Sequence, residues 1–78
     1  MSVRHLDSMN YEDKMNIVTA LKRVWDVRLT CDDRWLVWDM SEWTVYQRKY
    51  GAKKTQTLCS TKSEHKAIKV LIEGEAIR

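Results

Sequence analysis

Apolar and polar residues follow a helical period near the start of the chain. Between residues 10 and 25, apolar side chains recur at positions that share one face of a helix; they are Ile17, Val18, Leu21, Val24 and Trp25. Asn10 is a favoured N-cap, and the acids at 12 and 13 then fall in the first turn, where the helix dipole stabilises negative charge. The pattern predicts a helix over residues 10–25.

From residue 27 the period changes to two, which is typical of strands with one buried face. The alternation predicts strands over residues 27–31, 34–39, 42–50 and 53–60. The strands are separated by residue pairs that suit tight turns, namely Asp32-Asp33, Met40-Ser41 and Gly51-Ala52. We expect a type II′ turn at the last pair, because glycine is favoured at the first central position of that turn.

A second helix is predicted after the strands. Thr61 and Glu64 match the T-x-x-E capping box that begins many helices, and Gly74 is placed to end the helix. The apolar stripe between them consists of Ala67, Ile68 and Leu71. Residues 75–78 are then expected to form a flexible tail, as are residues 1–9.

The three two-residue turns also fix which residues lie opposite one another. They place Leu29 opposite Leu36, Trp38 opposite Trp43, and Val45 opposite Leu58. All three turns agree on one apolar face, made of Val27, Leu29, Leu36, Trp38, Trp43, Val45 and Leu58. We therefore predict one α+β domain over residues 1–78, in the order α-β-β-β-β-α, with an antiparallel meander sheet and both helices packed on one face.

The opposite face of this sheet carries aromatic and basic side chains with no further element to cover them. Its expected members are Arg28, Thr30, Trp35, Val37, Thr44, Tyr46, Arg48, Tyr50, Thr55, Thr57 and Cys59. Cys31 is expected on the helix side, so a disulfide between the two cysteines is not predicted. The candidate binding residues are three aromatic anchors with a charged surround: Trp35, Tyr46 and Tyr50, with Arg28, Arg48, Lys53 and Lys54.

Such a face supports three interpretations. It can bind a partner protein or a second copy of the chain, since Trp, Tyr and Arg are enriched at binding hot spots. It can bind DNA or RNA by base stacking and phosphate contacts. Alternatively, the aromatic residues only brace the sheet. We favour a protein partner or self-association, in the manner of small adaptors and inhibitors such as phage-encoded proteins.

Composition narrows the class of protein. The 78 residues carry a net charge of +3, and no apolar run is long enough for a membrane span or a secretory signal. We therefore expect a cytoplasmic protein that does not insert into a membrane. The segment 48–62 contains five basic side chains and no acidic one, which is compatible with nucleic acid.

Catalytic and metal-binding patterns are missing from the sequence. His5 and His65 have no nucleophile at a motif spacing, and Asp32 and Asp33 are better explained as turn residues. The two cysteines and two histidines do not have the paired spacing of a zinc site. We expect a protein that is not an enzyme, with no cofactor, metal or small-molecule substrate.

Two known families share parts of this pattern. Residues 10–74 resemble the double-stranded RNA-binding domain in element order. That family has a basic cluster at the start of its last helix, and the corresponding stretch here, TKSEHKAIKVL, contains only Lys62, Lys66 and Lys69. The stretch WTVYQRKYGAKKTQTLCSTKSEHKAIKVL resembles the three-strand-plus-helix DNA-binding module of plant AP2 and integrase arm-binding domains. The second resemblance implies DNA binding through the exposed sheet face.

Overall fold

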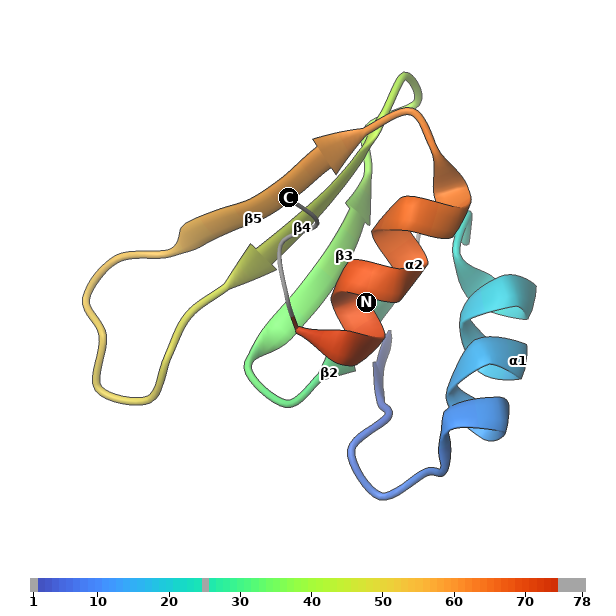
Figure 1. Cartoon of the computed structure of the whole chain (residues 1–78), viewed down its shortest axis with the longest axis horizontal. Coiled ribbons are helices and arrows are strands. Elements are labelled where there is room, and N and C mark those ends of the chain that lie inside the picture. The colour runs from blue at the N-terminus through green and yellow to red at the C-terminus, as the bar shows by residue number, and fades with distance from the viewer. Residues whose placement is uncertain (1, 25, 75–78) are drawn as a thin grey trace.

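The computed structural model describes residues 2–24 and 26–74, which form a five-stranded sheet and two helices (Figure 1). The predictions for Trp25 and for the tail 75–78 lie outside the described residues. The elements are β1 (Ser2–His5), α1 (Tyr11–Leu21), β2 (Val27–Cys31), β3 (Arg34–Trp38), β4 (Trp43–Gln47), β5 (Gln56–Thr61) and α2 (Glu64–Glu73).

The sheet is mixed, with strand order β1-β2-β3-β4-β5. The predicted α+β class is confirmed, but the prediction of a purely antiparallel, four-stranded sheet is wrong, because β1 pairs in parallel with β2. The amide of Leu6 continues this pairing with a 2.9 Å hydrogen bond to the carbonyl of Thr30. Leu6 is fully buried, so its side chain attaches the N-terminal segment to the core.

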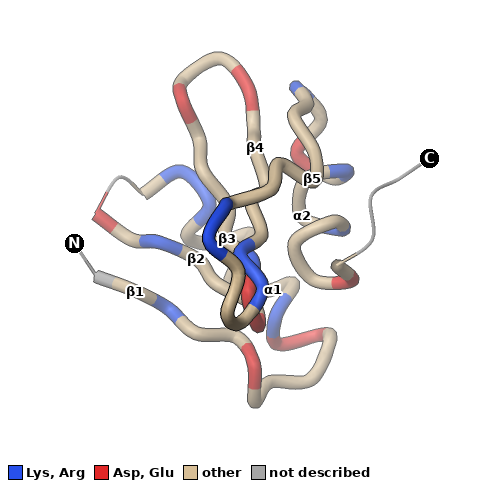
Figure 2. The backbone as a smooth tube through the Cα atoms, turned by 90° about the vertical axis from the view of Figure 1, so that its left-hand side faces the viewer, with Lys and Arg blue, Asp and Glu red and all other residues tan. Residues whose placement is uncertain are grey.

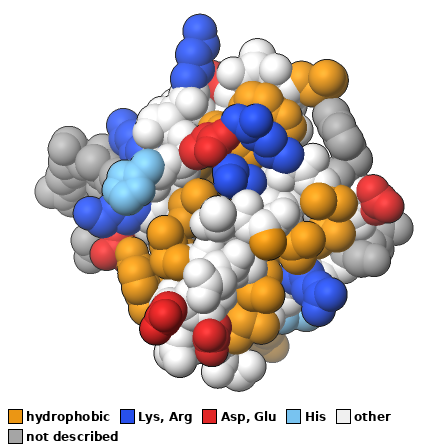
Figure 3. Space-filling model, turned by 90° about the vertical axis from the view of Figure 1, so that its right-hand side faces the viewer, with side chains coloured by type: hydrophobic (Ala, Val, Ile, Leu, Met, Phe, Trp, Pro, Cys, Tyr) orange, Lys and Arg blue, Asp and Glu red, His pale blue; other side chains and the backbone are white. Residues whose placement is uncertain are grey.

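The hydrophobic core lies between α2 and the sheet. Helix α2 contacts strands β2 to β5, and α1 contacts α2 and β2. The core consists of Leu6, Val18, Leu29, Cys31, Leu36, Trp43, Val45, Ala67, Ile68, Val70, Leu71 and Ile72. Seen from the side of the helices, hydrophobic side chains (orange) lie among charged ones (Figure 3).

The first two predicted turns and their registers are confirmed. Leu29 lies opposite Leu36, and Trp38 lies opposite Trp43. Asp32 and Met40 adopt positive φ angles of 55° and 76°, as the tight turns require of a central residue. With these turns in place, Leu36 is buried and Trp38 packs against the core, while Trp35 and Val37 are partly exposed, as the alternation predicts.

The third predicted turn is wrong. Strand β4 ends at Gln47 and β5 begins at Gln56, so residues 48–55 form a loop. Within this loop the amide of Ala52 donates a 2.9 Å hydrogen bond to the carbonyl of Lys49, and Gly51 has a φ of 80°. Gly51 is therefore the second central residue of the turn, the position at which a type II turn requires a positive φ. The predicted type II′ turn would have had glycine as its first central residue.

Next to the loop, Tyr46 and Gln47 pair with Thr57 and Gln56, as the predicted turn also requires, and the pairing of β5 changes only further along the strand. A bulge falls between Val45 and Tyr46, so Val45 lies opposite Cys59 and not opposite Leu58. Leu58 and Cys59 both pack, partly buried, against the core. The prediction that Cys59 points to the open side is therefore wrong. Both cysteines are free thiols.

The helix ends differ in detail from the predictions. Asn10 caps α1 as predicted, and its side chain accepts a 2.9 Å hydrogen bond from the amide of Asp13. The helix ends at Leu21, so Val24 lies beyond it and is 41% exposed. The cap of α2 is Ser63 and not Thr61, while Gly74 ends α2 with a left-handed φ of 77°, as predicted. Neither helix of the described part is both long and apolar enough to cross a membrane.

Candidate binding surface

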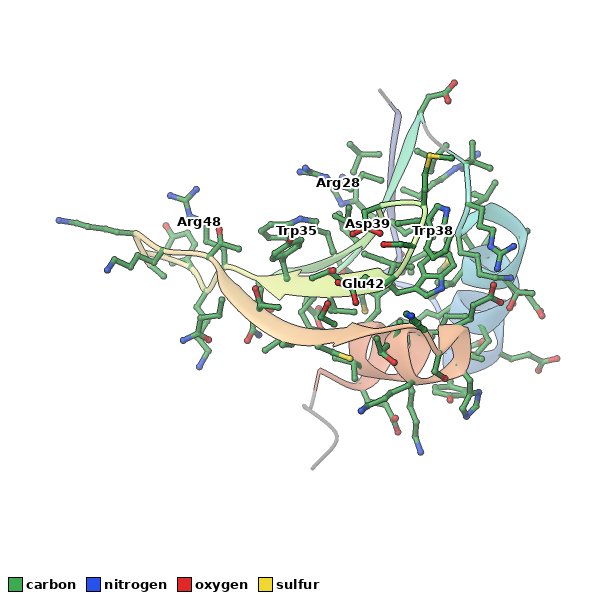
Figure 4. The ribbon with its side chains drawn as sticks, turned by 90° about the horizontal axis from the view of Figure 1, so that it is seen from above. Arg28, Trp35, Trp38, Asp39, Glu42 and Arg48 are labelled. Atoms are coloured by element: carbon green, nitrogen blue, oxygen red, sulfur yellow. The ribbon has the colours of Figure 1, made fainter. Side chains whose placement is uncertain are left out.

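One side of the central strands carries a row of partly exposed side chains. Trp35 and Val37 on β3 alternate with buried residues, as do Thr44 and Tyr46 on β4. Figure 4 shows Trp35 and Arg28 on the side of the sheet opposite α2. We call this surface the open face and define it by Arg28, Thr30, Trp35, Val37, Thr44 and Tyr46.

Trp35 lies at the centre of a three-residue stack. Its ring centroid is 5.7 Å from that of Tyr46, with an angle of 30° between the ring planes. The Cζ atom of Arg28 lies 5.4 Å from the centroid of the same indole ring. Arg28 and Tyr46 come from β2 and β4, the two strands that flank β3. The predicted pairing of Trp35 with Tyr46 is confirmed.

The other predicted binding residues lie apart from this stack, in the loop 48–55. The loop projects beyond the body of the molecule (Figure 1), and its basic residues are blue in Figure 2, where this side faces the viewer. Tyr50 is fully exposed, and Lys53 and Lys54 are also exposed. Arg48 is held at the base of the loop, where its Nε donates a 3.1 Å hydrogen bond to the carbonyl of Ala52.

The opposite end of the open face is acidic. Asp39 and Glu42 belong to the turn between β3 and β4, which carries two red segments in Figure 2. The pKa of Asp39 is lowered because Oδ1 accepts hydrogen bonds from the backbone amides of Glu42 and Ser41 and from the hydroxyl of Ser41. The carboxylate thus holds the turn together while keeping its negative charge.

A second feature, near the end of α1, was not predicted from the sequence. The guanidinium of Arg23 lies 5.3 Å from the ring centroid of Trp38 and 5.8 Å from that of Trp43, and it pairs with Glu64. An adjacent cavity of about 230 Å³ is lined by Lys22, Arg23, Val24, Val27, Arg28, Leu36, Val37 and Trp38. It lies where the pairing of β2 with β3 stops at Leu29 and Leu36. The sequence contained no signal for this cavity, because it results from the separation of two strands.

A buried arginine was also missed. Arg34 is 8% exposed and donates hydrogen bonds to the carbonyls of Leu71 and Ile72 at the end of α2. A signal was present, because alternation places residue 34 on the same side of β3 as Leu36. A charged residue at that position indicated a buried polar contact.

The described residues do not bring titratable side chains together as a metal site would. Within residues 2–24 and 26–74 there is no cluster of three or more His, Cys, Asp or Glu that could hold a metal ion. His5 lies in β1, where its Nδ1 is 2.9 Å from the hydroxyl of Thr30. This contact joins the edge strand to β2.

The fold and surface define a small α+β domain whose sheet carries an aromatic and basic face. The chain matches no protein-family model, no curated protein and no solved structure. The resemblances to the RNA-binding and DNA-binding modules therefore rest on element order alone.

Proposed function

We propose that this is a non-catalytic binding protein that contacts a partner protein through the open face. The observation that carries the proposal is the Arg28–Trp35–Tyr46 stack, which gathers on one sheet face the three residue types most enriched at protein-binding hot spots. Threonine and valine side chains surround the stack, as in the mixed polar and apolar interfaces of many non-obligate complexes.

The proposal takes both helices to lie on the other face of the sheet, as predicted from the sequence. Two observations support this arrangement. Helix α1 contacts α2, which packs on the sheet, and Val18 of α1 belongs to the same buried cluster as Leu71 of α2 and Leu29 of β2. The open face is then left for a partner.

The geometry of the stack favours protein over nucleic acid at this position. Base stacking requires a free aromatic face, and the Trp35 indole already lies against Tyr46 and Arg28 of its own sheet. The neighbouring Val37 and Thr44 are partly exposed beside it. Such a surface suits the close packing of side chains at a protein interface.

A cytoplasmic location is part of the proposal. Cys31 and Cys59 are both unpaired, as is usual for proteins in a reducing compartment.

Site-specific photocrosslinking tests the proposed function. A photoreactive amino acid at Val37, expressed in the native cell, should yield a discrete crosslinked protein. The same amino acid at Tyr11, which is 54% exposed on α1, is the matched control and should not yield that product. Combining the Val37 probe with Trp35→Ala should remove the product. Equal crosslinking from both positions would contradict the proposal.

A second candidate function, nucleic-acid binding, is favoured by one observation. The loop 48–55 carries four basic side chains and no acidic one, together with the fully exposed Tyr50. If all four cations contact phosphates, the logarithm of affinity for a single strand should fall with the logarithm of salt concentration with a slope of roughly −3.

Fluorescence anisotropy of a labelled mixed-sequence oligonucleotide tests this second candidate. The variant Lys53→Ala/Lys54→Ala should weaken binding and reduce the slope, whereas Lys69→Ala on α2 should change neither. If the oligonucleotide does not bind the wild-type chain even at low salt, nucleic-acid binding by this loop is excluded.

A further inference from the structure

We infer that the partner of the open face is a second copy of this chain, related by a two-fold axis that lies in the plane of the interface and runs across the strands. The inference rests on the proposed function and names its partner. Two independent features of the open face, its shape and its charge, select the same axis.

The first feature is the alternation of large and small rows across the sheet. One row contains the bulky pair Trp35 and Tyr46. The next row on the same face contains Val37 and Thr44, which pair directly, and Thr44 continues to Ser60 on β5. A bulky row therefore lies beside a row that is shallow on β3, β4 and β5, with the buried pair Leu36 and Val45 marking the boundary between them. Arg28 of β2 stands at the edge of the shallow row and leans toward Trp35.

A two-fold axis across the strands at this boundary exchanges the two rows. The Trp35–Tyr46 row of each copy then packs on the Val37–Thr44 row of the other. A two-fold axis along the strands would instead place bulky row on bulky row and leave the shallow rows apart. Because close packing is what makes an apolar interface stable, the shape of the face selects the first axis.

The second feature is the distribution of charge along β4. Glu42 is three positions before Val45, and Arg48 is three positions after it. Backbone hydrogen bonds from Asp39 to the carbonyl of Glu42 (3.2 Å) and from Arg48 to the carbonyl of Asp33 (3.0 Å) continue the pairing of β3 with β4 by one residue at each end. Both positions have the same parity as Thr44 and Tyr46, so the alternation places them toward the open face. The axis at Val45 brings Glu42 of each copy opposite Arg48 of the other, whereas the axis along the strands pairs like charges.

The remaining charges near these ends are compatible with this arrangement. The loop adds Lys49, Lys53 and Lys54 to the basic end, and Asp39 adds to the acidic end. Asp32 and Asp33 also lie at the basic end, but each is engaged by its own chain. Asp32 lies 3.4 Å from Arg34, and Oδ1 of Asp33 lies 2.9 Å from the side-chain amide of Gln47 and 3.8 Å from Arg34. The interface is therefore self-complementary in the way that a two-fold interface requires.

Sedimentation equilibrium of the full chain, from micromolar to millimolar concentrations, is the first measurement. We expect a monomer–dimer equilibrium for the wild type and loss of the dimer in Trp35→Ala. A wild-type chain that stays monomeric over this range overturns the inference. Dimers that persist unchanged in Trp35→Ala overturn it as well, because the interface would then lie elsewhere.

Charge reversal tests the orientation of the two copies. Glu42→Lys and Arg48→Glu should each weaken the homodimer about tenfold, because each places like charges together twice. The double variant Glu42→Lys/Arg48→Glu should recover most of the wild-type affinity, and so should an equimolar mixture of the two single variants. Lys69→Glu on α2 reverses a charge away from the face and should have no effect.

The double variant separates a specific pairing from a change in net charge or stability. Urea unfolding of each variant checks that the folded state is retained. If the double variant is as weak as the single variants, the proposed axis is wrong. Failure here is distinct from failure of the proposed function, because a monomeric wild type that still gives the Trp35-dependent crosslink to another protein retains the open face as a binding surface.

Discussion

The Nε atom of Arg34 donates a 2.8 Å hydrogen bond to the carbonyl oxygen of Leu71, and thereby joins strand β3 to the last turn of α2. A second guanidinium nitrogen reaches the carbonyl of Ile72 at 3.2 Å and Asp32 at 3.4 Å. The last carbonyls of a helix have no partner within the helix. Arg34 therefore satisfies two of them in a buried position.

Replacing Arg34 should destabilise the domain strongly. In Arg34→Met the two carbonyls lose their donors while the aliphatic volume is largely kept. An unsatisfied buried polar group costs about 1–3 kcal/mol, so we expect a loss of about 2–4 kcal/mol in the free energy of unfolding, measured by urea denaturation. Arg34→Lys should recover only part of this loss, because lysine lacks the planar fork. Full stability in Arg34→Met would show that water satisfies these carbonyls.

Gly74 should be sensitive to substitution for a related reason. It has a φ of 77°, and a Cβ atom added there would lie 2.5 Å from Nη1 of Arg34. Gly51 is the matched control, because it has a φ of 80° but no atom within 4 Å of the added Cβ. Both Gly→Ala changes carry the strain of a positive φ, about 1–2 kcal/mol.

The additional loss of unfolding free energy in Gly74→Ala, relative to Gly51→Ala, should therefore measure the steric contact with Arg34. We expect Gly74→Ala to lower the free energy of unfolding clearly more than Gly51→Ala, and the excess to shrink in the Arg34→Met background. Equal effects of the two substitutions would mean that Arg34 moves aside without cost.

These two residues also illustrate what the sequence could predict. The end of α2 at Gly74 follows from a local rule and was predicted. The pairing of β2, β3 and β4 was predicted too, because the turns at Asp32 and Met40 are short and the alternation between them is regular. The role of Arg34 depends on α2 passing beside β3, which no local pattern specifies.

The incorrect predictions also concern features that local sequence patterns do not determine. Strand β1 has four residues and pairs with β2, which lies more than twenty positions away, so it has no periodic signal of its own. Gly51 can serve type II or type II′ turns, which are mirror images that require glycine at the second or at the first central position. For the candidate site, alternation correctly brought Trp35 and Tyr46 together. It wrongly extended β4 and β5 into the loop, and this error placed Tyr50, Lys53 and Lys54 beside the stack.

The turn at Asp39 should make stability depend on pH in the acidic range. Its carboxylate accepts hydrogen bonds from Glu42 and Ser41, so the pKa in the folded state lies below the ordinary value of 3.8. A lowered folded pKa means that the carboxylate stabilises the folded state above the unfolded pKa and loses this contribution as the pH falls through the folded pKa.

Asp39→Asn removes this dependence while keeping the side-chain shape. At neutral pH the variant should be less stable than the wild type, and the difference should shrink as the pH falls below 4, where the wild-type carboxylate becomes protonated. Urea unfolding at a series of pH values measures both curves. A difference that is constant down to pH 2 would contradict the assignment of the effect to this ionisation.

Loss of an indole ring should lower the free energy of unfolding much more on the core face of the sheet than on the open face. Trp43 is 1% exposed in the core and packs on Trp38 at a centroid distance of 4.5 Å. Trp43→Ala should cost about 3–5 kcal/mol, which approaches the whole stability of a small domain. Trp38 is only partly buried, so Trp38→Ala should cost less than Trp43→Ala while still destabilising the fold.

Trp35→Ala should leave the domain folded. The ring is partly exposed and loses contacts mainly with Tyr46 and Arg28, so we expect a cost of about 1 kcal/mol. The same change should abolish the crosslink from Val37 and the self-association described above. Thermal unfolding and the binding assays on the same preparations compare the two effects. If Trp35→Ala unfolds the chain as Trp43→Ala does, the stack stabilises the fold, and this result would contradict the proposal that the open face is a binding surface.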